Sequence, residues 1–249
     1  MKSDLALKTE DKIEVSNTSP SVGAAEREAA PLAHEAIHDV VTEILKSSPE
    51  RGALLDAPAG EGALAARLIG LGFDVKCCDL YPEIFRLKDV EIKRGDLSGT
   101  LPYKDGEFDF ITCVEGLEHI ENPQQAVREF ARLMRPGGEL VVSIPNILNI
   151  EERFKWLLGG YTSHFKPLSR AHLDNLRRDF GSMEEIALHV NAISYSEIRF
   201  TLEKYGFEIR RLYRDKPKAH IWAYWPAVAL IRLIGRLTPQ HKRSERWTT

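Results

Sequence analysis

Two acidic residues in the first third of the chain stand where neighbouring strands are expected to end. One short apolar run closes on Asp56 and is followed by a turn that contains Gly60 and Gly62, and a second apolar run closes on Asp79. Glycine lets a backbone enter positive-φ turns and approach a ligand closely. A helix after Gly62 would aim free N–H groups and partial positive charge at the turn, which suits a carboxylate. The pattern favours a nucleoside cofactor whose amino-acid end lies at the first strand end and whose ribose lies at the second.

A denser group of reactive side chains occurs farther along the chain. Glu115, Glu118 and His119 directly follow the apolar run 108–114. Carboxylates and imidazole are the side chains that most often carry protons or bind metal ions in active sites. Since ligands bind at the carboxyl ends of strands in open α/β sheets, we expect this group at the same edge as the acidic strand ends.

The elements that position these residues alternate along the chain. Strands are expected at 53–57, 73–79, 90–94, 108–114, 138–145 and 207–213, and helices at 31–48, 62–71, 123–134 and 196–205. A turn at Pro136-Gly137-Gly138 is expected to join a helix to the strand after it. Such alternation indicates an α/β fold in which helices cover both faces of a parallel sheet.

The segments around Asp56 and Asp79 together resemble the first two motifs of the class I S-adenosylmethionine-dependent methyltransferases. The resemblance covers residues 35–145 well and 185–215 loosely. It implies a Rossmann-like, doubly wound, mostly parallel sheet of seven strands that binds S-adenosyl-L-methionine. Asp79 would accept the ribose hydroxyls and Asp96 the adenine amine. The other cofactor contacts implied are Asp56, Ala57, Pro58, Gly60, Gly62, Leu80, Leu97 and Glu115.

The run from Cys113 to Pro123, spelled C-x-E-x-L-E-H-I-x-x-P, resembles the same stretch of the ubiquinone-biosynthesis O-methyltransferases. It is also similar to the glutamate-glutamate-histidine site of the small-RNA 2′-O-methyltransferases, in which His189 would stand for a further histidine ligand. These resemblances imply that Glu118, His119 and His189 are catalytic. They also imply Mg²⁺ or another divalent metal on Glu115, Glu118, His119 and His189. Two alternatives stay open, a metal-free site with a histidine general base and a set of residues that only lines the pocket.

The function expected from these motifs is methyl transfer to a hydroxyl oxygen of a small or lipid-linked acceptor, such as a quinone precursor or a glycan sugar. An NAD(P)-dependent oxidoreductase is an alternative, because Gly60 to Ala65 also fits the G-x-G-x-x-A pattern. An RNA 2′-O-methyltransferase and a non-catalytic Rossmann-like binding module are further alternatives. A net charge of -3 argues against DNA as a partner and disfavours RNA.

Composition divides the chain into a domain and its flanking segments. Residues 1–30 are polar, without the apolar core of a secretory signal, and are expected to be disordered. The methyltransferase domain is expected at 31–225, with 146–188 as a lid or acceptor-binding insertion, because long connections in compact domains are usually functional. Residues 226–249 are expected to form a C-terminal helix and a basic tail.

The apolar run 221–237 raises the question of a membrane. Pro226 and Arg232 interrupt it, and spanning a bilayer takes about 20 apolar residues. Peripheral contact through 221–246 is one interpretation and packing on the domain is the other. The three cysteines are expected to be buried apolar side chains. That cysteine usage favours the cytoplasm, with membrane association as an option.

Overall fold

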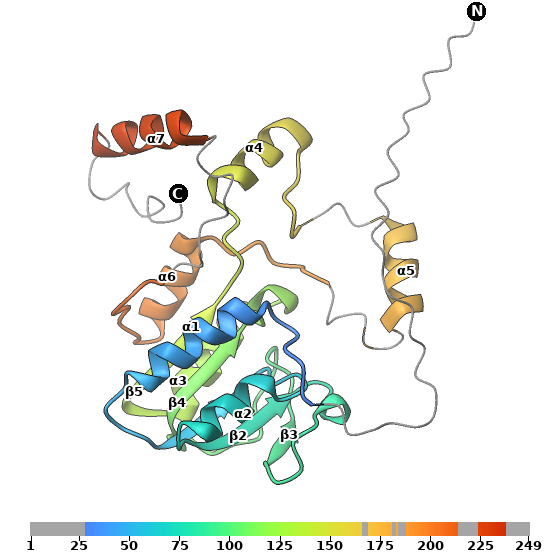
Figure 1. Cartoon of the computed structure of the whole chain (residues 1–249), viewed down its shortest axis with the longest axis vertical. Coiled ribbons are helices and arrows are strands. Elements are labelled where there is room, and N and C mark those ends of the chain that lie inside the picture. The colour runs from blue at the N-terminus through green and yellow to red at the C-terminus, as the bar shows by residue number, and fades with distance from the viewer. Residues whose placement is uncertain (1–27, 166–168, 181–182, 184–187, 214–223, 238–249) are drawn as a thin grey trace, which may run out of the picture.

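The computed structural model describes residues 28–165, 169–180, 183, 188–213 and 224–237. Within these ranges the chain forms a five-stranded sheet with the order β3-β2-β1-β4-β5 (Figure 1). All neighbouring strands pair in parallel. The strands are β1 (Ala53–Asp56), β2 (Asp74–Asp79), β3 (Ile92–Arg94), β4 (Phe108–Val114) and β5 (Met134–Ser143).

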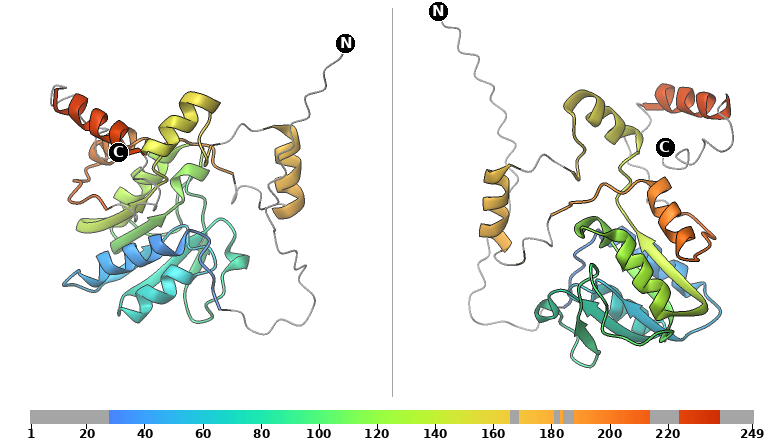
Figure 2. Two further views of the ribbon diagram at one scale, coloured as in Figure 1. Left: turned by 45° about the horizontal axis from the view of Figure 1, so that its top comes forward. Right: turned by 180° about the vertical axis from the view of Figure 1, so that it is seen from behind.

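Helices cover both faces of the sheet, as Figures 1 and 2 show. Because successive strand residues point to opposite faces, β1 contributes to two cores. Leu54 belongs to the core that includes residues of α1 (Glu35–Lys46) and α2 (Ala63–Gly70). Leu55 belongs to the core that includes α3 (Pro123–Leu133) and α6 (Tyr195–Lys204). The expected α/β, parallel, doubly wound arrangement is therefore confirmed.

Capping side chains fix where the helices near the carboxyl edge of the sheet begin. Asn122 accepts a hydrogen bond from the N–H of Gln125 at the start of α3, and Ser194 forms a capping box with Glu197 at the start of α6. Such caps satisfy N–H groups that have no partner inside the helix. The remaining elements are the short 3-10 helices η1 (Pro82–Ile84) and η2 (Leu117–His119), and the helices α4 (Ile150–Gly159), α5 (Arg170–Phe180) and α7 (Trp225–Leu237).

Two expectations about strands are wrong. Residues 207–213 form no strand, although Phe207 and Ile209 are half-buried between exposed neighbours, because β5 is the last strand of the described sheet and does not pair with them. The strand expected at 138–145 is β5, which already begins at Met134. Residues around Pro136 form a bulge in it instead of a turn before it.

The expected count of seven strands is not confirmed. The expectations for the first 27 residues and for the basic tail after 237 concern segments outside the described residues. All three cysteines are free and buried, as expected. Among the described helices, none has both the length and the apolar character that crossing a bilayer requires.

Candidate active site

The turn between β1 and α2 requires its two glycines. Gly60 has a φ of 54° and Gly62 a φ of 95°, in the left-handed region that side chains disfavour. A Cβ at Gly62 would lie 2.8 Å from the ring of Phe85, so the neighbouring side chains also exclude one. Gly62 is the residue before α2, and its own N–H donates to the carbonyl of Ala59 at 2.9 Å, so the N–H groups without a partner inside the helix are those that follow it. The turn has the form that an anionic group of a ligand needs.

Asp79, at the end of β2, ties the two strand ends together. Its Oδ2 accepts a hydrogen bond of 2.8 Å from the N–H of Gly60, and its Oδ1 accepts one of 2.8 Å from the N–H of Tyr81. The side chain is buried. Each carboxylate oxygen can accept more than one hydrogen bond, so the group retains capacity for a ribose hydroxyl. The structure brings Asp79 and the glycine turn together, and the ribose role stays a prediction.

Asp56, the last residue of β1, is buried. Its Oδ1 accepts a hydrogen bond of 2.7 Å from the hydroxyl of Thr112 on β4, a partner that sequence reasoning missed. Its Oδ2 has no hydrogen-bond partner among the residues that the structure describes. Burial raises the pKa of Asp56 from 3.8 to about 7. Asp56 therefore joins the end of β1 to β4 through Thr112.

The raised pKa of Asp56 predicts a pH-dependent stability. Because its pKa is higher in the folded chain than the ordinary 3.8, its contribution is complete below 3.8 and is lost as the pH rises through about 7. The free energy of unfolding should therefore fall over this interval relative to that of Asp56→Asn, as measured by urea titration. Asp89→Asn, at an exposed position, is the control and should follow the wild type. Parallel curves for wild type and Asp56→Asn would refute the assignment.

The residues expected at the adenine lie around the ends of β2 and β3. Asp96 is exposed, and its Oδ1 accepts a hydrogen bond of 2.7 Å from the N–H of Ser98. Leu97 is buried and Leu80 is half-buried. In the ladder between β2 and β3, Asp79 is the partner of Arg94. Asp96 therefore follows the strand beside Asp79, which agrees with the predicted order of ribose and adenine contacts.

Pro58 brings the glycine turn against the loop after β4. A Cβ at Gly116 would lie 2.5 Å from Cδ of Pro58, so this approach requires glycine. Pro58 follows Ala57, whose N–H donates to the carbonyl of Thr112 at 3.0 Å and so keeps the end of β1 on β4. The expected cofactor turn and the expected catalytic loop are therefore in contact.

Glu115 opens the catalytic loop in an unusual backbone conformation. Its φ is 48°, which is uncommon and costly for a residue other than glycine. Ser143, at the end of β5, stabilises it twice: its Oγ accepts a hydrogen bond of 3.0 Å from the N–H of Glu115 and donates one of 3.0 Å to Oε1. Burial raises the pKa of Glu115. Sequence reasoning missed Ser143, although a serine at a strand end facing a glutamate is the available signal.

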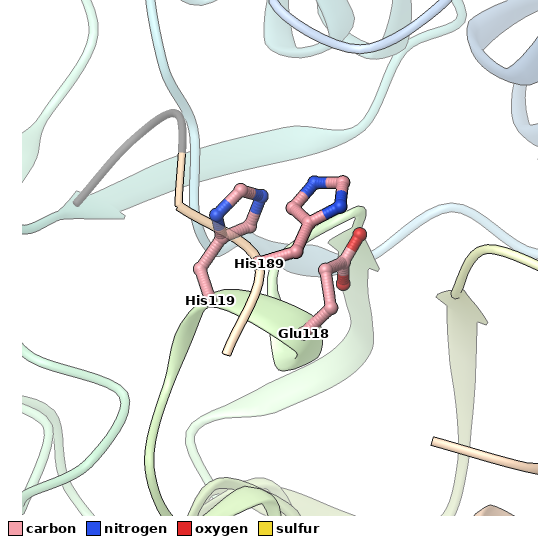
Figure 3. Close-up of side chains that lie close together, drawn as sticks. All are labelled: Glu118, His119 and His189. Atoms are coloured by element: carbon pink, nitrogen blue, oxygen red, sulfur yellow. The ribbon is translucent and has the colours of Figure 1, made fainter. Parts of the chain in front are cut away.

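Glu118, His119 and His189 form one cluster (Figure 3). One ligand atom from each lies within 4.8 Å of those of the others, and the two imidazole centroids are 4.6 Å apart. The N–H groups of Val190 and Asn191 both donate to the carbonyl of Glu118, at 2.8 and 3.0 Å, which fixes the segment carrying His189 on η2. The structure therefore brings together three of the four predicted metal-site residues.

The hydrogen bonds of the two histidines determine their tautomers. Nδ1 of His119 lies 3.0 Å from the carbonyl oxygen of Leu188, and Nδ1 of His189 lies 3.2 Å from that of His164. Because a carbonyl only accepts, Nδ1 carries the proton in each neutral ring and Nε2 holds the lone pair. Burial, followed by the nearby His119 and His164, lowers the pKa of His189 to about 4, so this ring is neutral near pH 7. Both rings present a nitrogen that can accept a proton or bind a metal.

Glu118 is a buried carboxyl whose charged neighbour is another carboxyl, that of Glu115. Neither oxygen has a hydrogen-bond partner within the described part of the chain. Burial, followed by the nearby charge of Glu115, raises its pKa to about 8. A bound cation would compensate for such a group, and one carboxylate with two imidazoles is a donor set that suits a first-row transition metal such as zinc. The three residues therefore fit a divalent metal. Glu115, which is bonded to Ser143, lies beside Glu118 but is not among the three residues whose ligand atoms lie within 4.8 Å of one another.

Comparisons with known proteins point to methyltransferases. A family model described as a methyltransferase domain matches residues 27–212. The ubiquinone biosynthesis O-methyltransferase of Psychrobacter cryohalolentis is 29% identical over 57% of this chain and 63% of its own length. The same-named protein of Xanthomonas oryzae is 32% identical over 37% of this chain and 43% of its own length. The chain thus spans less than two thirds of the length of these curated relatives.

Solved structures include a distant likeness. A methyltransferase of Thermotoga maritima, described as a possible histamine N-methyltransferase, is 22% identical to the chain with a TM-score of 0.47. The match covers 70% of this chain and 72% of that one. This likeness does not bear on the acceptor.

Proposed function

The chain belongs to the methyltransferase-domain family, and from that membership we propose that it transfers a methyl group from S-adenosylmethionine to a hydroxyl oxygen of a small or lipid-linked molecule. The observation that carries the proposal is the cluster of Glu118, His119 and His189 beside the glycine turn. A hydroxyl must lose a proton when it is methylated, and the imidazole nitrogens of this cluster can accept one. The relatives named for ubiquinone biosynthesis support a quinone precursor as the acceptor class.

In the proposed reaction one set of residues binds the cofactor and another removes the proton of the acceptor. The glycine turn holds the methionine end of the cofactor, and Asp79 holds the ribose. The acceptor oxygen attacks the methyl carbon in line with the carbon–sulfur bond, which breaks and leaves its electron pair on sulfur. Nε2 of His119 takes the hydroxyl proton and releases it to water. Because the sulfonium is already activated, positioning supplies much of the rate, about 7 to 11 kcal/mol in favourable cases.

A divalent metal held by Glu118, His119 and His189 is the alternative to the histidine base, because an Nε2 lone pair that binds a metal cannot also accept a proton. The carboxyl of Glu118 without partners among the described residues and the Nε2 lone pairs of the two histidines support it. When bound, the metal would orient the acceptor hydroxyl and lower its pKa. Glu115 then keeps its hydrogen bond to Ser143 and borders the site.

An acceptor assay tests the proposal. The protein is incubated with S-adenosylmethionine labelled in the methyl group and with one of three acceptors: a prenylated catechol, histamine or a short RNA. We expect the label on a catechol oxygen by mass spectrometry. The same yield after treatment with a chelator would assign proton removal to His119, and loss of product would assign it to a bound metal. Labelling of histamine nitrogen or RNA alone would overturn the proposed acceptor class.

A further inference from the structure

Two helices beyond the sheet expose large apolar side chains. On α4, Trp156, Leu157 and Leu158 are 54, 77 and 84% exposed; on α7, Trp225, Leu230 and Leu233 are 62, 57 and 54% exposed. We call these six residues the apolar surface. Both helices lie on the same side of the molecule, away from the sheet (Figures 1 and 2). The rings of Phe154 and Tyr224, 5.6 Å apart, connect them. Large apolar side chains exposed on neighbouring elements are typical of a docking site.

The charges around the apolar surface indicate what it docks against. The charged residues in the sequence of α7 are all arginines, and none is acidic. The acids of α4, Glu151 and Glu152, lie in its first turn, whereas Trp156 begins the exposed run near its end. The sequence of residues 238–249 adds Lys242, Arg243 and Arg246 against one acid, Glu245. Tryptophan and leucine beside basic residues suit the boundary between acyl chains and anionic headgroups.

The length of the helices fixes how they would contact a bilayer. α7 has 13 residues and α4 has 10. Neither reaches the roughly 20 apolar residues that a spanning helix needs, so both would lie in the interface.

Helix α4 also leads to the cluster of Glu118, His119 and His189. Oε2 of Glu152, a buried residue of α4, accepts a hydrogen bond of 2.6 Å from the N–H of Ser163. The next residue, His164, lies with its carbonyl oxygen 3.2 Å from Nδ1 of His189. One helix and a short loop therefore join the apolar surface to the proposed acceptor site.

We propose that the apolar surface of α4 and α7 docks the protein onto an anionic phospholipid membrane, where an acceptor dissolved in the bilayer is near His189. Membrane docking itself does not depend on the proposed function. Only the claim that docking gives access to an acceptor in the bilayer rests on it. Vesicle binding is therefore measured without acceptor or cofactor, so that a failure of docking and a failure of O-methylation can be told apart.

Co-sedimentation of the full chain with vesicles tests docking. The vesicles contain equimolar phosphatidylcholine and phosphatidylglycerol, or phosphatidylcholine alone. Wild type should bind the anionic vesicles, and less of it should bind in high salt. The double variants Leu157→Ser with Leu158→Ser, and Leu230→Ser with Leu233→Ser, should each lower the partition coefficient by about tenfold or more, because apolar area no longer leaves water.

Phe200→Ser is the matched control, since Phe200 is 61% exposed on α6, outside the apolar surface. It should bind as wild type does, and circular dichroism verifies that every variant is folded. Wild type that stays in solution, or double variants that bind equally well, would overturn the proposal. So would ultracentrifugation in which wild type dimerises through these leucines and does not bind vesicles, because the surface would then serve a second copy of the chain.

Discussion

Replacing His119 with alanine is expected to lower kcat for methylation of a prenylated catechol by about 10² to 10⁴, the range that a positioned proton acceptor usually contributes. The reason is the fixed tautomer, in which Nδ1 donates to the carbonyl of Leu188 and Nε2 retains the lone pair. The dissociation constant for S-adenosylmethionine should change little, because the glycine turn and Asp79 bind the cofactor. Steady-state kinetics and calorimetry measure the two quantities.

Two further variants test whether this effect belongs to the cluster. Glu118→Gln keeps the shape of the buried carboxyl but removes its ability to ionise, and it should also lower kcat. Glu121→Gln makes the same change at an exposed position shortly after His119 and should leave kcat as in wild type. Equal kcat in wild type and His119→Ala, with catechol still methylated on oxygen, would exclude His119 as the proton acceptor.

Asp79→Ala is expected to weaken binding of S-adenosylmethionine by about a hundredfold, since hydrogen bonds to charged groups contribute about 1.5 to 3 kcal/mol each. The substitution removes the proposed ribose acceptor and also the partner of the Gly60 N–H, so the glycine turn loses its attachment to β2. Calorimetric titration of the variant gives the dissociation constant.

Asp74→Ala is the control for this loss, because Asp74 is the exposed first residue of the same strand. Asp79→Asn should bind the cofactor with intermediate affinity, since its single carbonyl oxygen can replace only part of the carboxylate. If the dissociation constants of Asp79→Ala and wild type are the same, the ribose lies elsewhere.

The sequence predicted the part of the fold that depends on local pattern. Short apolar runs that end in Asp56 and Asp79, with glycines after the first, are local signals, and the structure has β1, β2 and the turn there. The alternation at 207–213 is an equally local signal, but a strand also needs a hydrogen-bonded neighbour, and β5 does not supply one. The bulge near Pro136 was missed because its pairing with β4 is a tertiary contact.

The candidate site divides in the same way. Glu118 and His119 are adjacent in sequence, and the resemblance supplied His189, which the structure brings to them. The hydrogen bonds from Ser143 to Glu115 and from Thr112 to Asp56 each join two neighbouring strands. Whether they form depends on the register between those strands, which the local sequence does not show. The positive φ of Glu115 could not be predicted, because a positive φ is usually signalled by glycine and this residue is a glutamate. The surrounding contacts hold its backbone in that conformation.

The central claim is that the cofactor's reactive methyl faces the cluster of Glu118, His119 and His189. A crystal structure with sinefungin, which carries an amine in place of the methyl sulfonium, tests this most directly. We predict that sinefungin lies between the glycine turn and Asp79, with its amine directed at His119. Sinefungin bound elsewhere, or bound there with its amine pointing away from all three residues, would contradict the claim.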